Sequence, residues 1–474
     1  LGSKYVPLYK IHSYHTKVPY PIMMQFLLHY TEPGDIVFDG FSGAGMTGLA
    51  TKMLSKPPQK LKHEFDNLPR SNNFQWGNRY LIQSELSPAA SFISSNYMTP
   101  RDTIHLRQNL KNALGELKSL CEEHYRISLS DDAGRIRYIV WSEHVVCDSC
   151  GNNFSLWEGT VTYKIGNKVG SVSEHIKCPS CGNKIIKRSA KKYLHSYYDD
   201  IVNEVVKTVK YTPVLVNYES FTGGIKELIP DNNLQVSLIK RFGSYTKGHF
   251  PCTRIPFTHL THERNNLRES HGFEYVHQFF QPSTLFVFKI WDDIAEQSPN
   301  KNFLKWVLTA SFNRLTRMVR YMPQHKERNV GPLSKTLYVS GLFGEINPID
   351  VIERKINGIL KDIDYFSGDS VVVNSTQSTT DIDIIPNNSV DYIFTDPPFG
   401  GNIMYSDSNL LWESWLRVRG ATIEEAIVNT AQKKGFDEYR DIVLLCFKQM
   451  YRILKPGRWI TVEFSNTQAA IWNV

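Results

Sequence analysis

Ile393-Phe394-Thr395-Asp396-Pro397-Pro398-Phe399-Gly400 is the most informative stretch of this 474-residue chain. An apolar run from Tyr392 to Phe394 ends in an acid, two prolines and an aromatic residue, which is typical of a buried strand that the prolines stop. Because proline has no N–H, the carbonyls here and the Asp396 carboxylate stay available as acceptors. They are expected at the carboxyl end of the strand, where open α/β sheets bind ligands. The stretch therefore predicts a site that grips an amine, with Phe399 as a flat face for an aromatic ring.

The four residues from Asp396 to Phe399 resemble the Asp-Pro-Pro-Tyr/Phe motif of the amino-methyltransferases, which methylate N6 of adenine or N4 of cytosine. The resemblance implies four catalytic residues: Asp396, Pro397, Pro398 and Phe399. An ordinary strand-to-loop turn with two prolines is the alternative for the tetrapeptide taken alone. Other parts of the chain have to separate the two interpretations.

Residues 36–48, Ile-Val-Phe-Asp-Gly-Phe-Ser-Gly-Ala-Gly-Met-Thr-Gly, supply a second pattern. An apolar strand runs into a glycine-rich loop and then into a helix, and glycines let a ligand approach the backbone closely. A dinucleotide-binding fold would also use Gly-x-Gly. The loop resembles the Phe-x-Gly-x-Gly form of the S-adenosylmethionine loop, and no Lys-Ser/Thr follows as in a P-loop. The cofactor-binding residues implied here are Asp39, Phe41, Ser42, Gly43, Gly45 and Thr47.

Further cofactor contacts are expected on either side of this loop. A second strand, 80–85, ends in Glu85, and an acid there accepts hydrogen bonds from ribose hydroxyls. A third strand, 370–374, precedes Asp381, which the resemblance assigns to the adenine amine, with Asp383 as second choice. Upstream of the loop, the resemblance places His15 and Lys17 over the methionine end, although a polar entry loop explains them equally well.

The order of these motifs predicts an α/β fold with a Rossmann-like methyltransferase sheet. The resemblance covers residues 4–100 and 365–474, and includes a helix at 439–454 and a strand at 459–464. A large α+β insertion lies between its two parts. Because the family sheet usually continues with another helix and a hairpin, we expect the C-terminal end of the sheet to be truncated at Val474. The start at Leu1-Gly2-Ser3 looks like a cloning scar, so a longer parent protein is expected.

A pair of cysteine knuckles in the insertion predicts a metal site. Each has the pattern Cys-x-x-Cys-Gly, and the ligands would be Cys147, Cys150, Cys178 and Cys181. Two such turns let four thiolates surround one tetrahedral zinc, and four sulfurs leave no open position for catalysis. We therefore expect a structural zinc ribbon, with strands around 154–157 and 161–163. Four free cysteines and a redox pair are the alternatives.

The composition narrows the class of protein. The net charge of +7 permits nucleic-acid binding without requiring it, and 41% apolar content is ordinary for globular proteins. No apolar run reaches membrane-spanning length. Four of the seven cysteines belong to the metal pattern, which favours a cytosolic protein over a disulfide-linked one. The expected location is the cytoplasm, in association with the nucleoid.

Basic residues in the insertion are candidates for DNA contact. Lys184, Lys187 and Arg188 follow the second knuckle, and a helix expected at 302–321 would carry Arg314, Arg317 and Arg320 opposite its apolar face. A solvated surface is the alternative for both groups. Target recognition is placed at 214–282 by elimination. The expected segments are 1–105, the cofactor-binding part of the core; 106–140, a helical linker; 141–195, the ribbon; 196–364, the recognition and DNA-binding insert; and 365–474, the catalytic part of the core.

The predicted function is transfer of a methyl group from S-adenosylmethionine to N6 of an adenine flipped out of double-stranded DNA. Asp396 and the Pro397 carbonyl would accept the amine protons, so that positioning and charge complementarity supply the rate. An N4-cytosine enzyme, an RNA base-amine methyltransferase and a non-catalytic DNA-binding module are the alternatives. Subunits of a restriction or phage-defence system are open as further partners.

Overall fold

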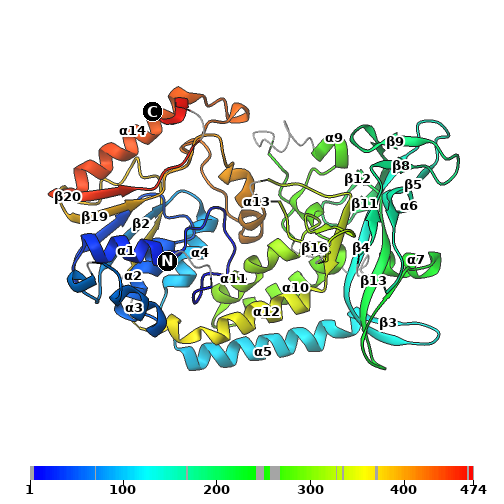
Figure 1. The fold of residues 1–474 in the computed structure, drawn as a ribbon, viewed down its shortest axis with the longest axis horizontal. Helices are drawn as coiled ribbons and strands as arrows, with labels where there is room; N and C mark the ends of the chain where they lie inside the picture. The colour runs from blue at the N-terminus through cyan, green and yellow to red at the C-terminus, as the bar shows by residue number, and fades with distance from the viewer. Residues whose placement is uncertain are drawn as a thin grey trace. The chain divides into compact units, whose positions relative to one another are not determined.

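The structure is a computed structural model that describes residues 5–69, 71–166, 169–241, 250–256, 267–326, 328–333, 336–368, 372–466 and 469–472. The chain forms two compact units, whose elements are labelled in Figure 1. Unit 1 comprises residues 1–109, 257–260 and 357–474, and unit 2 comprises 110–256 and 261–356. Among the described residues, every helix is too short or too polar to cross a bilayer.

Unit 1 is built on a five-stranded sheet in which each neighbouring pair of strands is parallel. Its order is β18-β2-β1-β19-β20. Figure 1 labels β2, β19 and β20 of this sheet. The strands are β1 (Ile36–Asp39), β2 (Tyr80–Glu85), β18 (Val372–Thr376), β19 (Val390–Thr395) and β20 (Leu454–Val462). Val37 pairs with Tyr392, so β1 and β19 are neighbours although they lie far apart in the sequence. Their loops therefore leave the sheet side by side.

Helices cover both faces at the centre of this sheet, which explains why β1 and β19 are buried, mainly apolar runs. On one face, the ring of Phe394 lies 5.6 Å from that of Phe26 in the first helix. On the other, Ile393 packs in one cluster with Met450. Successive strand side chains point to opposite faces, so both must be buried. The helices are α1 (Tyr20–Tyr30), α2 (Met46–Ser55), α3 (Gln59–Asp66), α4 (Pro88–Met98), α13 (Tyr405–Leu416), α14 (Phe436–Ile453) and α15 (Ala469–Trp472).

Most predicted elements of unit 1 are confirmed, with shifted bounds. The predicted third strand starts at Val372, and Ser370 lies outside the described residues. The last strand was predicted to begin at Trp459 but begins at Leu454. Pro456 fits inside it because β20 pairs only with β19, at a point where the register shifts, and edge strands tolerate proline.

Unit 2 contains an antiparallel sheet around one long strand, β4 (Ala133–Val146). Its order is β14-β13-β4-β17-β15-β16, and β3, β5 and β10 also pair with β4. Trp141, Val216 and Phe343 share the core cluster on this sheet. The other strands are β3 (Arg126–Ser128), β5 (Asn153–Ser155), β6 (Val161–Thr162), β7 (Ser171–Val172), β8 (His175–Lys177), β9 (Lys184–Ile186), β10 (Lys191–Lys192), β11 (Leu194–Asp199), β12 (Glu204–Val209), β13 (Tyr211–Ser220), β14 (Ile225–Leu228), β15 (Arg320–Tyr321), β16 (Asn329–Val330) and β17 (Leu342–Ile346).

Helices of unit 2 correct two sequence predictions. The expected helical stretch 106–140 is helical only through α5 and a 3-10 turn that ends at Tyr125, and strands follow. The helix expected at 302–321 ends at Ser311. Leu315 and Val319 are buried although they lie beyond the end of the helix. The apolar spacing therefore predicted burial correctly but not the helix. The helices are α5 (Thr103–Cys121), which starts in unit 1, α6 (Leu156–Thr160), α7 (Asn232–Lys240), α9 (Leu267–His271), α10 (Pro282–Glu296), α11 (Lys301–Ser311) and α12 (Pro348–Lys361), which ends in unit 1.

Candidate active site and cysteine cluster

A cavity in unit 1 collects residues from the glycine loop, the end of the second strand, the Asp-Pro-Pro-Phe segment and the segment upstream of the loop. The predicted site residues that line it are His15, Lys17, Asp39, Phe41, Ser42, Gly43, Thr47, Glu85, Asp396 and Pro398. Four predicted site residues do not line it: Gly45, Asp381, Pro397 and Phe399. Asp381 is exposed, and the neighbouring Ser378 and Thr379 line the cavity instead.

The glycine loop is held by its own backbone. Gly43 has φ +50°, and its N–H donates to Glu85 Oε2 at 2.7 Å. Gly45 has φ +78° and begins α2. A Cβ on Gly45 would lie 2.1 Å from Ser94 Oγ, so its small size serves the packing of the loop against α4. Gly45 therefore affects the loop through its packing against α4.

Two acids end the strands on either side of the loop. Asp39 Oδ2 accepts a hydrogen bond from Thr47 Oγ1 at 2.5 Å, and Glu85 Oε1 accepts one from the Ser87 N–H at 2.8 Å. Burial raises the pKa of Asp39 to about 6 and the pKa of Glu85 to about 7. The hydrogen bonds work against this shift because they favour the carboxylates. Both acids therefore have pKa values close to neutral pH, and a cationic ligand would stabilise their carboxylate forms.

Asp396 offers the cavity an acceptor that the described residues leave unused. Its Oδ1 is buried and has no hydrogen-bond partner among the described residues. Burial raises the pKa of Asp396 to about 8, and the negative charges of Glu463 and Asp39 add to the effect. By contrast, the Pro398 carbonyl already accepts a hydrogen bond from Tyr439 Oη at 2.7 Å. A buried acceptor without a donor is costly, so this carboxyl suits a ligand that brings one.

Phe399 and Lys17 have contacts outside the predicted motifs, whereas His15 Nε2 is buried without a hydrogen-bond partner among the described residues. Phe399 packs edge-on against Phe464, with ring centroids 5.3 Å apart. Lys17 Nζ donates to the carbonyls of Tyr9 at 2.7 Å and His12 at 3.1 Å. The ammonium group of Lys17 therefore holds the N-terminal segment together. Burial lowers the pKa of His15 to about 4, so this ring is neutral at pH 7.

Helix α13 contributes cavity residues that the sequence motifs did not indicate. Tyr405, Asn409 and Glu413 all line the cavity. Glu413 accepts hydrogen bonds from Ser87 Oγ at 3.0 Å and from the Gly420 N–H at 3.1 Å. The helix buries polar side chains as well as apolar ones, so it has no clear apolar stripe. Its position directly after the Asp-Pro-Pro-Phe segment was the one available signal.

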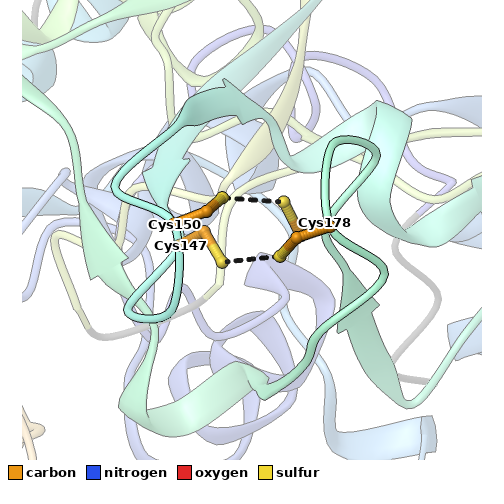
Figure 2. A group of neighbouring side chains, drawn as sticks. Cys147, Cys150 and Cys178 are labelled. Atoms are coloured by element: carbon orange, nitrogen blue, oxygen red, sulfur yellow. Dashed lines mark hydrogen bonds between the residues drawn. The ribbon is translucent and has the colours of Figure 1, made fainter.

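The four knuckle cysteines of unit 2 form one cluster. Their sulfur atoms all lie within 4.8 Å of one another. Cys147 Sγ lies 3.6 Å from Cys181 Sγ, and Cys150 Sγ lies 3.7 Å from Cys178 Sγ (Figure 2). Zinc–sulfur bonds of about 2.3 Å in tetrahedral geometry place neighbouring sulfurs about 3.8 Å apart. The cluster is therefore compatible with a zinc ion.

The two knuckles have the same backbone design. The Gly151 N–H donates to the Cys147 carbonyl and the Gly182 N–H to the Cys178 carbonyl, each at 2.9 Å. Both glycines have positive φ, +71° and +76°. This conformation turns the chain back after the second sulfur, which is why glycine follows each pair. The predicted strand at 154–157 is only partly confirmed, because α6 starts at Leu156.

The predicted DNA-binding residues have unequal surroundings. Lys184, Lys187 and Arg188 are exposed, as is Arg314. Arg320 is half-buried, and its Nε donates to the Gly331 carbonyl at 3.2 Å. The exposed cationic surface therefore lies on the ribbon side and at Arg314, whose Nη1 also donates to the Asn329 carbonyl at 3.3 Å.

Arg317 departs furthest from the expected exposed helix face. Its guanidinium lies 5.3 Å from the centre of the Tyr211 ring and 5.6 Å from that of Phe273. Its Nη2 donates to Gln281 Oε1 at 3.1 Å. The predicted helix has already ended, so the spacing that placed Arg317 beside Arg314 does not apply.

Comparison with known proteins gives a match to a family model. A family model described as "DNA methylase" matches residues 3–57, which include α1, β1, the glycine loop and α2. The match supports a DNA methylase. No curated protein and no solved structure matches the chain.

Proposed function

We propose that this chain is an S-adenosylmethionine-dependent DNA methyltransferase that methylates N6 of a flipped adenine. One observation carries the proposal: the unpartnered Asp396 carboxyl lines the same cavity as the glycine loop and Glu85. The family match over residues 3–57 supports the same class of enzyme. The parallel strand order around β1 supports a Rossmann-like assignment.

The cavity residues fit the proposed cofactor. Glu85 would accept the ribose hydroxyls, and the backbone of Ser42 and Gly43 would face the methionine part. Because the pKa values of Asp39 and Glu85 are raised, positive charge in the cavity would stabilise their carboxylates. The cofactor carries such charge on its sulfonium and ammonium groups. Bound there, S-adenosylmethionine supplies the methyl group. His15, Lys17, Phe41 and Thr47 would shape the same half of the site.

Asp396 is the proposed catalytic acceptor. An aromatic amine is a weak nucleophile because its lone pair is delocalised into the ring. Asp396 and the Pro397 carbonyl would each accept one amine hydrogen, which turns the lone pair out of the ring plane. The raised pKa of Asp396 favours its neutral form at pH 7, so the cationic cofactor would bind first and favour the carboxylate, which then stabilises the positive charge that the nitrogen gains. Phe399 would stack on the base after a side-chain movement away from Phe464.

Adenine is proposed over cytosine because the first motif position holds aspartate, whereas cytosine N4 enzymes resembling this one mostly have serine there. The target atom is inaccessible in a stacked duplex, so the base must be extruded. RNA remains the competing substrate within the same chemistry.

The unit 2 surface is proposed to hold the DNA. The cysteine cluster would bind one structural zinc and so fix the ribbon. Beside it lies a hollow whose lining includes Lys187, Arg188, Lys191 and Tyr338. Lysine and arginine beside an exposed aromatic ring suit a phosphate backbone and its bases. Lys184 and Arg314 would extend this contact, and residues 196–364 would read the target.

The test is direct analysis of the product. The protein is incubated with isotope-labelled S-adenosylmethionine and, in separate reactions, with genomic DNA or total RNA, and the digested nucleosides are analysed by mass spectrometry. N6-methyladenine is the expected product. Label in N4-methylcytosine or in RNA alone would show that the proposed substrate is wrong. Cofactor binding without any transfer would indicate a non-catalytic module.

A further inference from the structure

Asn409 of α13 has an unusual environment for a buried amide. Its side chain is fully buried, with 0% exposure, and lines the cavity. Its Nδ2 donates to Ser87 Oγ at 3.0 Å and to Tyr14 Oη at 3.3 Å. Its Oδ1 has no donor among the described residues. A buried carbonyl oxygen without a donor is destabilising, so its presence at this position calls for an explanation.

The hydrogen-bond network fixes which amide atom lacks a partner. Ser87 Oγ lies 3.0 Å from Glu413 Oε1. An ionised Glu413 can only accept, so the single hydroxyl hydrogen of Ser87 points at it. Ser87 Oγ must then accept from Asn409, which places Nδ2 on that side. If the Asn409 amide were rotated by 180°, its Oδ1 would face Ser87 Oγ, whose hydrogen is already donated to Glu413.

The same network places Asn409 on the cofactor half of the cavity. Ser87, its partner, also donates its backbone N–H to Glu85 Oε1 at 2.8 Å. Tyr14, its second partner, covers the glycine loop, where a Cβ on Gly43 would lie 3.3 Å from the Tyr14 ring. Asn409 is thus tied to Glu85 on one side and to the glycine loop on the other. Asp396 takes no part in this network.

We infer that Asn409 is a cofactor-specificity residue: its Oδ1 accepts a hydrogen bond from a ribose hydroxyl of the bound nucleoside, beside Glu85. The inference rests on the proposed function, because the ribose belongs to the proposed cofactor. Hydroxyl and amine groups are the donors that a nucleoside offers to such an acceptor. The tie to Glu85, the expected ribose acid, selects the hydroxyl over the purine amine.

Calorimetric titration with S-adenosylhomocysteine tests the inference, since this ligand has the same nucleoside and undergoes no transfer. Asn409→Ala should weaken its binding about ten-fold, the effect of one lost hydrogen bond. With a 2′-deoxy or 3′-deoxy analogue that lacks the contacted hydroxyl, wild type and variant should bind equally. Asn96→Ala is the matched control, because Asn96 is a buried asparagine of α4 outside the cavity with both amide groups bonded.

Each outcome is decisive. Unchanged S-adenosylhomocysteine affinity in Asn409→Ala overturns the inference. A penalty that persists with both deoxy analogues, but disappears with the analogue carrying inosine, assigns the contact to the purine amine and also overturns it. If Asn409→Ala does not fold, Asn409→Ser is measured in the same cycle. Failure of the wild type to bind S-adenosylhomocysteine would instead refute the proposed function.

Discussion

The sequence predicted functional side chains in two short segments, residues 393–400 of unit 1 and residues 312–321 of unit 2. The structure places the side chains of the two segments in different surroundings. In the first, two prolines end a buried strand and leave the Asp396 carboxyl in the cavity. In the second, helical spacing placed three arginines on one face, but the helix ends at Ser311 and Arg317 turns inward between two rings. Residues that restrict the backbone, such as the two prolines, allow the position of a neighbouring side chain to be predicted. Apolar periodicity predicts only which positions are buried.

The strongest test of the fixed region is Asp396→Asn. The amide keeps the shape but loses the charge that would stabilise the developing cation, and it cannot accept with the same strength. We expect methyl transfer in a single turnover to slow by about 10²–10³-fold, the range for one positioned electrostatic group. Affinity for S-adenosylhomocysteine should be retained. Asp441→Asn, at an exposed position of α14, is the control. A near wild-type rate in Asp396→Asn would refute the catalytic assignment.

The same contrast explains how much could be predicted from sequence. The strands β1 and β19 were found because a strand covered on both faces is a nearly continuous apolar run, and β2 was found from a shorter apolar run that leads to Glu85. The knuckles were found because each glycine is required by a positive φ after the second cysteine. Helix α13 was missed because Asn409 and Glu413 are buried polar residues whose partners lie far away in sequence. Lys17 and Phe399 were placed by resemblance, and their contacts depend on Tyr9 and Phe464, which no motif includes.

A second backbone-fixed region, the cysteine cluster, should fail as a unit. Cys178→Ser removes one of four thiolates, and structural zinc supplies a large share of the folding energy of such modules. Metal content should fall from about one zinc per chain to near zero, with faster hydrogen exchange in β8 and β9. Cys252→Ser is the control, because Cys252 is exposed and outside the cluster. Full zinc content in Cys178→Ser would argue against four-sulfur coordination.

The glycine loop offers a comparison within unit 1. Gly45→Ala should lower the free energy of unfolding by about 3 kcal/mol, because it combines a left-handed backbone with a clash at Ser94. Gly43→Ala should cost about 1 kcal/mol, since its Cβ would lie 3.3 Å from the Tyr14 ring. Chemical denaturation measures both. Gly115→Ala, in the open on α5, should be neutral or stabilising. Equal losses at both loop positions would contradict the packing role of Gly45.

Cofactor binding should depend on pH through the cavity acids. The pKa values of Asp39, Glu85 and Asp396 are raised to about 6, 7 and 8. Because each pKa is raised, the neutral acid predominates below it and the carboxylate above it. A cationic cofactor favours the carboxylates, so its affinity should rise between pH 6 and 8, by up to about ten-fold per unit while one group titrates. Calorimetry at several pH values would show this, together with proton release. In Asp396→Asn the rise near pH 8 should disappear, and a flat profile in the wild type would contradict the assignment.

The smallest effects are expected at single basic residues of unit 2, and they separate surface arginines from buried ones. Arg314→Gln removes an exposed charge, so if Arg314 touches a phosphate, the log–log salt dependence of DNA affinity should flatten by about 0.9. Lys187→Gln should behave alike, and neither change should alter sequence preference, because phosphate contacts position the duplex without reading it. Arg317→Gln should leave the salt slope unchanged and lower the free energy of unfolding by about 2 kcal/mol, since its guanidinium stacks on two rings and binds Gln281. Fluorescence anisotropy across a salt series, with denaturation of each variant, distinguishes these outcomes. A flattened slope with unchanged stability in Arg317→Gln would return this residue to the DNA surface, and helical spacing would then have located it after all.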